Sequence, residues 1–113
     1  MVVEDILSAI PSCCVAGRNG CSAEVTGGYA SDLLSNVMGQ ARAGNVWVTM
    51  QGHKNIVAVA SLAGLAAIVI AGGTKPDDQT AAMAEAENIP LLVTDLPVFE
   101  FAGQLYALGV KGL

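Results

Sequence analysis

With 113 residues, the chain has the length of one small domain, and we expect a single domain over residues 1–113. Its net charge of −5 and its five scattered Lys and Arg residues argue against nucleic acid or an anionic membrane as a partner, because both require clustered basic side chains. Hydrophobic residues make up 53% of the sequence and aromatic residues only 4%, so we expect a core of Ala, Val, Leu and Ile. The acidic start, with Glu4 and Asp5, is unlike a secretory signal, and we expect a cytoplasmic protein.

Apolar spacing and turn residues predict helices that alternate with strands along most of the chain. In chain order we expect a helix over 4–10, a strand over 13–16, a turn over 17–20, an apolar segment over 25–29, a helix from 31 or 32 to 44, a strand over 46–49, a helix over 56–62, a strand over 67–70, a helix over 77–87, a strand over 91–94 and a closing helix after 95. This alternation predicts an α/β fold, namely a three-layer α/β/α single domain with a mostly parallel or mixed sheet.

The longest apolar stretch, residues 56–73, has Ser61 as its only polar side chain and is borderline in length for a membrane span. Its first half is rich in Ala and its second half in β-branched residues, and Gly64 separates the two. A buried helix followed by a buried strand accounts for both halves, so we expect no membrane segment here.

Two helices carry specific expectations about caps and buried faces. Ser31 or Asp32 is expected to cap the helix that ends at Gly44, and Asp95 to cap the closing helix, with Pro97 in its first turn. The first of these helices is predicted to bury Leu33, Leu34, Val37 and Met38. The closing helix is predicted to bury Phe99, Phe101, Ala102, Leu105, Tyr106 and Leu108.

The three cysteines lie close together in the sequence, as Cys13, Cys14 and Cys21. An odd number of cysteines without a secretion signal indicates a reducing compartment. Their spacing matches no zinc pattern and His53 is the only histidine, so we expect no metal. We interpret the cysteines as small apolar core residues, with a thiol-based sensor or a cluster ligand set as the alternative.

Polar residues and glycines follow several predicted strands, where open parallel sheets gather their ligands. The candidate ligand-binding residues are Thr26, Gly27, Gly28, Asp32, Gln51, His53 and Asn55. Two glycines beside a helix start expose N–H groups that suit an anion, and alternation by two would place the side chains of 51, 53 and 55 on one side. We therefore expect a ligand against the Thr26–Gly28 backbone, faced by His53 and Asn55. Tight turns and helix capping are the alternative explanation of these glycines and of Asp32, and Gly72, Gly73 and Asp95 are weaker candidates.

Several catalytic signatures are missing from the sequence. It contains no Gly-x4-Gly-Lys-Ser/Thr loop, no Gly-x-Gly-x-x-Gly, no Gly-x-Ser-x-Gly and no His-Glu-x-x-His. We therefore expect a protein that is not an enzyme, has no cofactor and does not transfer phosphate from ATP, because nothing clamps the leaving phosphate.

Three stretches of sequence resemble a known family. The block Glu24-Val25-Thr26-Gly27-Gly28-Tyr29-Ala30-Ser31-Asp32-Leu33-Leu34-Ser35 resembles the signature of the DRTGG domain family, and Trp47 to Ala60 and Ile89 to Asp95 are similar to its stand-alone members. The resemblance implies a layered domain like the N-terminal domain of HPr kinase/phosphorylase. Such domains also occur beside CBS domains in regulated pyrophosphatases and in some phosphotransacetylases, where they are associated with regulation and subunit contact. Where the family name implies Asp-Arg ahead of Thr-Gly-Gly, we assign Ser22-Ala23, with both charges missing.

These observations lead to one functional hypothesis and its alternatives. We expect a non-catalytic regulatory or ligand-sensing module that binds a small anionic or nucleotide ligand. The main alternative is an accessory protein that docks on a metabolic or redox enzyme without a ligand of its own, and a lesser one is a small enzyme that uses His53. The charged fraction of 13% leaves much apolar surface, so we expect a homodimer.

Overall fold

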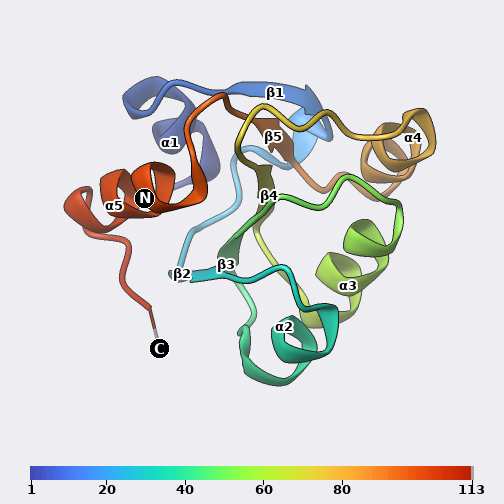
Figure 1. The fold of residues 1–113 in the computed structure, drawn as a ribbon, viewed down its shortest axis with the longest axis horizontal. Helices are drawn as coiled ribbons and strands as arrows, with labels where there is room; N and C mark the ends of the chain where they lie inside the picture. Colours follow the sequence, from blue (N-terminus) through green and yellow to red (C-terminus); the bar gives the residue numbers. More distant parts are fainter. Residues whose placement is uncertain (113) are drawn as a thin grey trace.

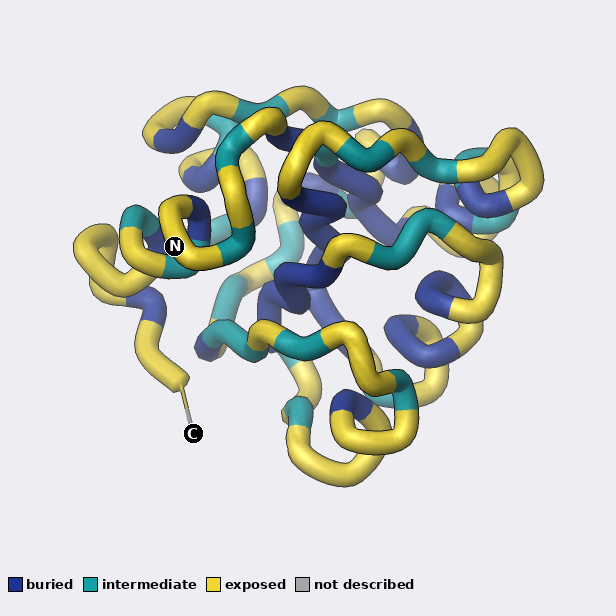
Figure 2. The backbone as a smooth tube through the Cα atoms, in the orientation of Figure 1, coloured by how far each residue is buried: buried dark blue, intermediate teal, exposed yellow. Residues whose placement is uncertain are grey.

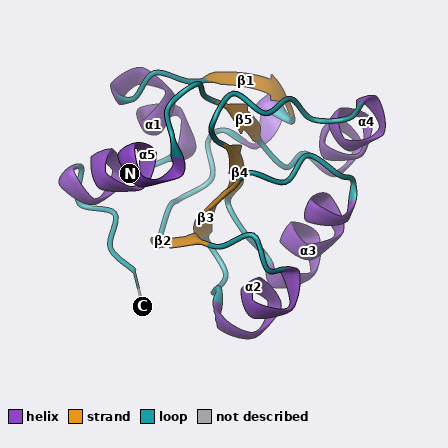
Figure 3. Ribbon diagram, in the orientation of Figure 1, coloured by secondary structure: helices purple, strands orange, loops and turns teal. Residues whose placement is uncertain are grey.

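The computed structural model describes residues 1–112, and its helices and strands alternate except near the N-terminus, where two strands follow each other (Figures 1 and 3). In chain order the elements are α1 (Val3–Ala9), β1 (Cys13–Ala16), the 3-10 turn η1 (Arg18–Gly20), β2 (Gly27–Ala30), α2 (Leu34–Gln40), β3 (Asn45–Thr49), α3 (Asn55–Ala63), β4 (Ala67–Ile70), α4 (Asp78–Glu87), β5 (Leu91–Val93) and α5 (Val98–Ala107). The predicted order of helices and strands is therefore confirmed.

The strands form one mixed sheet in the order β1-β5-β4-β3-β2. Strands β2, β3, β4 and β5 are parallel to one another, whereas β1 runs antiparallel to β5 at one edge. The central strands β3 and β4 are buried along their whole length, as their continuous apolar sequences predict for a sheet covered on both faces. The predicted mostly parallel or mixed sheet is confirmed.

Helices cover both faces of this sheet, so the domain has three layers (Figure 1). Helices α1 and α5 lie over one face, and α2, α3 and α4 lie over the other. Successive residues of β3 point to opposite faces, because Val46 and Val48 pack with α1 and α5 while Trp47 packs with α2 and α3. The predicted α/β/α arrangement is confirmed, and the buried backbone runs through the middle of Figure 2.

The apolar stretch 56–73 folds as a helix and a strand. It supplies α3, ended by Gly64 in a left-handed conformation (φ +69°), and then the buried strand β4. Within residues 1–112, none of the helices is both long enough and apolar enough to span a bilayer.

Helix α2 differs from its prediction in its cap, its length and its buried face. It begins at Leu34 and ends at Gln40, well before Gly44, and no side chain caps it. Of the four side chains predicted to be buried, Val37 is buried, Leu34 is half-buried, and Leu33 and Met38 are exposed. The prediction was wrong because Asp32, the expected cap, is hydrogen-bonded to β3 instead.

The closing helix α5 also departs from expectation. Pro97 is its N-cap residue, and Asp95 is not a cap, so that prediction was wrong. Phe101 and Leu105 are buried and Ala102 is half-buried, whereas Phe99, Tyr106 and Leu108 are exposed. A helix that packs one face on a sheet buries only a stripe, and the broad apolar face predicted here is therefore not fully covered.

Candidate functional site

The loops that follow β2, β3, β4 and β5 meet at one edge of the sheet, because these four strands are parallel. We call this the carboxyl edge. It also receives the segment that leads into β1, since β1 runs in the opposite direction. Of the predicted site residues, the carboxyl edge brings together Asp32, Gln51, His53 and Asn55.

Asp32 ties the loop after β2 to the loop after β3. Its carboxylate oxygen Oδ1 accepts hydrogen bonds from the Thr49 hydroxyl and from the backbone N–H of Met50, both at 2.8 Å. The side-chain amide of Gln51 donates to the Asp32 carbonyl at 2.6 Å. Asp32 is thus held as a structural tie between two strands.

A second set of bonds ties the loop after β3 to the start of α4. The Gly52 carbonyl accepts hydrogen bonds from the Asp77 N–H at 3.0 Å and from the Thr80 hydroxyl at 2.7 Å. Nδ1 of His53 lies 3.1 Å from the Asp77 carboxylate, and both side chains are largely exposed. The imidazole is therefore held beside Asp77 while most of the side chain stays exposed to solvent.

Two hollows open at the carboxyl edge on either side of the Gly72–Lys75 loop. The one beside the imidazole, which we call the His53 hollow, measures about 500 Å³ and is lined by Met50, Gln51, Gly52, His53, Thr74, Lys75 and Asp77. The other, which we call the β5 hollow, measures about 300 Å³ and is lined by Pro11, Ser12, Cys13, Gly73, Thr74, Lys75, Val93, Thr94, Asp95 and Leu96. Both volumes fall in the range of small-molecule sites.

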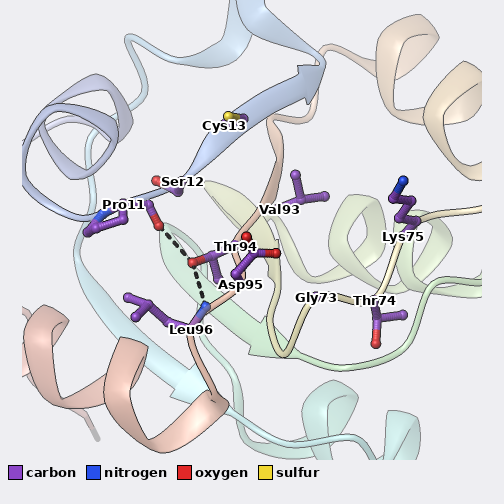
Figure 4. A pocket seen from close by; sticks show the side chains of 10 residues that line it. All are labelled: Pro11, Ser12, Cys13, Gly73, Thr74, Lys75, Val93, Thr94, Asp95 and Leu96. Atoms are coloured by element: carbon purple, nitrogen blue, oxygen red, sulfur yellow. Dashed lines mark hydrogen bonds between the residues drawn. The ribbon is translucent and has the colours of Figure 1, made fainter.

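The floor of the β5 hollow is a hydrogen-bonded junction of three segments (Figure 4). The buried Thr94 hydroxyl donates to the Pro11 carbonyl at 2.7 Å and accepts from the Leu96 N–H at 3.1 Å. Asp95 reaches toward the loop that carries Gly73, where a Cβ atom would lie 3.6 Å from its Oδ1. The end of β5 and the start of β1 are thus joined below an open surface.

Lys75 is the basic side chain that both hollows share. Within residues 1–112, the backbone N–H groups of His53, Thr74 and Lys75 donate to no other protein group. The N-terminus of α3 has no side-chain cap, and α4 also begins beside the His53 hollow. Free N–H groups, helix starts and an ammonium group together favour a negatively charged or strongly hydrogen-bonding ligand.

Thr26, Gly27 and Gly28 lie at the opposite edge of the sheet. Gly27 begins β2 and is paired with Asn45, the first residue of β3, whereas His53 follows the end of β3. The expectation that His53 and Asn55 face these glycines was therefore wrong. Ligands gather beyond the carboxyl ends of parallel strands, whereas Thr26–Gly28 lie at the amino end of β2.

Gly27 and Gly28 allow close backbone approach, as predicted, but the group that approaches them is the backbone of Lys111 in the same chain and not a ligand. The Gly28 N–H donates to the Lys111 carbonyl at 2.9 Å, and a Cβ atom on Gly27 would lie 2.9 Å from the same oxygen. Gly28 also lines a small hollow of about 210 Å³ beside α5 and the residues that follow it. Ligand binding by Thr26–Gly28 stays a prediction, separate from the carboxyl edge.

Residues 51, 53 and 55 do not share one side, so this expectation was also wrong. Gln51 reaches toward β2, His53 reaches toward α4, and Asn55 is the exposed first residue of α3. Lys54 already has a helical conformation (φ −57°, ψ −22°). Alternation by two requires an extended backbone, and the chain turns into the helix before it can continue.

The cysteines divide between the surface and the interior. Cys13 is exposed and lines the β5 hollow, Cys14 is half-buried, and Cys21 is buried in the core beneath α1. Burial, with a smaller effect of the neighbouring Cys14 thiol, raises the pKa of Cys21 to about 11. Within residues 1–112, no three or more His, Cys, Asp or Glu side chains gather in a metal-binding arrangement.

The sequence reasoning missed Thr74 and Lys75, the two residues common to both hollows. Their position could have been inferred, because they follow Gly72 and Gly73 directly after a buried strand. Both glycines have a positive φ, at +75° and +77°, which turns the loop back over the strand ends. Pro11 and Ser12 could not have been found, since only the antiparallel pairing of β1 brings them here.

The chain is thus a three-layer α/β domain with open hollows at the carboxyl edge of its sheet, which is where open α/β sheets bind their ligands. Residues 5–108 match the model of the DRTGG domain, and the chain therefore belongs to the DRTGG domain family. This confirms the resemblance found in the sequence. A search of curated proteins found no match.

Among solved structures, the chain is similar to the CBS and DRTGG domains of the regulatory region of Clostridium perfringens pyrophosphatase, crystallised with the activator diadenosine tetraphosphate. The TM-score is 0.71 and the sequence identity 12%, with 92% of this chain and 45% of that chain covered. At this identity the likeness shows a shared fold. This chain thus corresponds to less than half the length of that regulatory region.

The residues directly before Thr26 are Glu24 and Val25, so the assignment of the family's Asp-Arg pair to Ser22-Ala23 was wrong by two positions. An acidic residue is therefore retained as Glu24, and only the basic charge is missing. Glu24 is exposed and forms an isolated antiparallel bridge with Val2, whereas Val25 packs partly against the core. Val25, an apolar residue, thus stands where the family name implies arginine.

Proposed function

We propose that the chain is a non-catalytic regulatory module that senses a small anionic or nucleotide ligand at its carboxyl edge. The ligand occupies the His53 hollow and extends toward the β5 hollow across Thr74 and Lys75. The observation that carries this proposal is the pair of open hollows that share Lys75 and adjoin backbone N–H groups without a partner in residues 1–112.

The chemistry of these groups supports recognition rather than catalysis. The Lys75 ammonium and the N–H groups of His53 and Thr74 supply donors for phosphate or carboxylate oxygens. Gln51 and Asn55 add amide groups that orient a polar ligand, although one Gln51 donor is already used by Asp32. Asp77 and Asp95 repel an anion from the ends of the site, which limits where a phosphate is accepted.

The structural neighbour supports a regulatory role of the same kind. Its DRTGG domain belongs to a regulatory region that was crystallised with a dinucleotide activator. We extend only the class of ligand to this chain, as part of the proposal. The ligand's identity is to be found by screening nucleotides and phosphorylated metabolites by thermal shift, since binding to the folded state raises its stability.

Charge-matched variants test the placement. Lys75→Gln and His53→Ala are expected to reduce the affinity for any compound that raises the Tm of the wild-type chain. Arg42→Gln is the control, because it removes one exposed positive charge at the other edge of the sheet. Equal affinities in Lys75→Gln, His53→Ala and the wild type would overturn the placement. A loss in Gly28→Val alone would support the separate prediction for Thr26–Gly28.

A second candidate function, docking on another protein without a ligand, is favoured by the exposed aromatic residues of α5. Phe99 is 84% exposed and Tyr106 is 58% exposed, and their spacing of seven residues places them on one face of the helix. Exposed aromatic residues on one face of a helix are typical of protein interfaces. This function is favoured if no nucleotide or phosphorylated metabolite changes the Tm.

The predicted homodimer stays a prediction, and the same helix face offers a way to test it. We expect light scattering at micromolar concentration to give twice the chain mass of 11.4 kDa. Phe99→Ser is expected to yield the monomer, whereas Leu62→Ser, at a 77% exposed position on α3, leaves the mass unchanged. A wild-type monomer would contradict the prediction.

A further inference from the structure

Two cysteine thiols, one buried and one half-buried, lie close to each other. Sγ of Cys21 lies 3.8 Å from Sγ of Cys14, although the two residues belong to different segments of the chain. Cys14 is in the edge strand β1, and Cys21 follows the 3-10 turn η1. The ligand site described above uses neither of them, because it is lined by Cys13 alone of the three.

The backbone holds both thiols in place. Cys14 is paired with Leu92 in the sheet, which fixes the strand that carries it. Cys21 is held on both sides, because its N–H donates to the Arg18 carbonyl at 3.0 Å and its carbonyl accepts from the Glu4 N–H at 2.9 Å. The fold therefore places the two residues side by side, and rotation of their side chains sets the distance between the sulfur atoms.

We propose that Cys14 and Cys21 form a reversible intramolecular disulfide when the protein meets a small-molecule disulfide such as oxidised glutathione. A disulfide holds its sulfur atoms at roughly 2.05 Å, so side-chain rotation has to bring the two thiols closer by about 1.8 Å. Cys14 lies beside an irregularity of the strand, because the β1–β5 register shifts between Cys14 and Ala16.

Cys13 is the wrong partner for either thiol. Successive side chains of a strand point to opposite faces, and Cys13 is exposed while Cys14 turns partly inward. Cys13 also lines the β5 hollow, on the side of β1 away from Cys21. The fold thus selects one pair of the three cysteines.

The burial of the two residues sets the order of the chemical steps. Cys21 is only 4% exposed, and its raised pKa keeps its thiol protonated near neutral pH, so Cys14 reacts first. The Cys14 thiolate attacks one sulfur of the small-molecule disulfide, forms a mixed disulfide and releases one thiolate. Cys21 then gives up its proton to solvent, attacks the Cys14 sulfur and releases the second small thiol. Two protein thiols and one disulfide become one protein disulfide and two small thiols.

The sequence allows a direct readout by mass spectrometry. Trypsin cleaves after Arg18, which separates the peptide 1–18, with Cys13 and Cys14, from the peptide 19–42, with Cys21. The folded protein is incubated with oxidised and reduced glutathione, its free thiols are blocked, and it is unfolded and digested without reduction. We expect the two peptides to be linked, with fragmentation placing the bond at Cys14, and the link to be lost after reduction.

Single cysteine variants distinguish this proposal from random pairing among the three cysteines. Cys14→Ser and Cys21→Ser are expected to lose the link, and Cys13→Ser to keep it. The wild-type chain treated in urea gives the pairing of the unfolded state for comparison, and Cys14→Ser carries the test if the buried Cys21→Ser variant fails to fold. The proposal is overturned if the folded chain stays reduced, if it stops at glutathionylated Cys14, if the bond includes Cys13, or if folded and unfolded chains pair alike.

Discussion

The two edges of the parallel sheet use glycine for different physical reasons. At the carboxyl edge, Gly72 and Gly73 have positive φ angles that turn a loop over the strand ends and leave hollows on both sides. At the opposite edge, Gly27 and Gly28 have no positive φ, and their lack of a side chain lets Lys111 pack against β2. A glycine pair in a sequence therefore indicates either a shaped loop or a close contact, and only the surrounding chain distinguishes the two.

The first prediction tests the packed edge and has the largest expected effect. Gly27→Ala places a Cβ atom 2.9 Å from the Lys111 carbonyl and 3.1 Å from the Asn45 amide. We expect the free energy of unfolding to fall by about 1–3 kcal/mol, as overpacking usually costs. Chemical denaturation of this variant and of Gly39→Ala provides the measurement, because Gly39 has nothing within 4 Å of its Cβ position. Equal losses in the two variants would show that close packing is not the cause.

The second prediction extends the comparison to the thiols, since Cys13 is at the open edge and Cys21 is in the packed interior. The ordinary pKa of 9.0 rises to about 11 for Cys21 in the folded state, mainly through burial. The resulting stability is fully present below pH 9 and is lost as the pH rises to about 11, because only the unfolded chain releases its proton there.

The expected loss over that interval is on the order of 2 kcal/mol. Denaturation at a series of pH values measures it, with Cys21→Ala and Cys13→Ala compared with the wild type. Cys21→Ala is expected to flatten this part of the pH profile, although its stability at neutral pH also falls, and Cys13→Ala keeps the wild-type slope. A profile that is unchanged in Cys21→Ala contradicts the prediction.

The third prediction concerns the hydrogen bonds by which Asp32 joins the loops after β2 and β3 at the carboxyl edge. Asp32→Ala leaves the Thr49 hydroxyl and the Met50 N–H without their acceptor. Because Thr49 is buried, we expect the free energy of unfolding to fall by about 1–2 kcal/mol. Asp95→Ala is the control at the same edge, since the Asp95 carboxylate makes no hydrogen bond within residues 1–112. If both variants are equally stable, Asp32 is not the tie that its geometry indicates.

The smallest effect is expected at the loop glycine of the carboxyl edge. Gly73→Ala meets no steric obstacle, because the nearest atom is 3.6 Å from the new Cβ, but the residue must keep a φ of +77°. We expect a loss of about 1 kcal/mol from the left-handed conformation alone. Gly103→Ala, in the open middle of α5, is the comparison and is expected to be neutral or stabilising. A loss at Gly73 as large as at Gly27 would remove the distinction between the two edges.

Local patterns in the sequence determined the elements of this fold. The run Ala67–Ile70 reads as a buried strand, and Asn88 ends α4 in a left-handed conformation, as the predicted boundary at Glu87 requires. Signals of this kind depend on neighbours within a few residues, so they can be read without the fold. The blocks around Thr26–Gly28 and Trp47–Ala60 also determined the family, which the match over residues 5–108 confirms.

The composition of the site was decided only in the tertiary structure. Asp32 has the residue type of a helix cap, but its carboxylate accepts hydrogen bonds from the buried Thr49 hydroxyl at the end of β3 and from the following Met50 N–H, and it does not cap α2. In the sequence, Thr26–Gly28 and His53 both lie beside a strand, but the first precede β2 and the second follows β3, so the parallel pairing of the two strands places them at opposite edges. The antiparallel pairing of β1 brings Pro11 and Ser12 to the β5 hollow. The direction of a strand within its sheet depends on long-range pairing, and that information is not contained in any local stretch of residues.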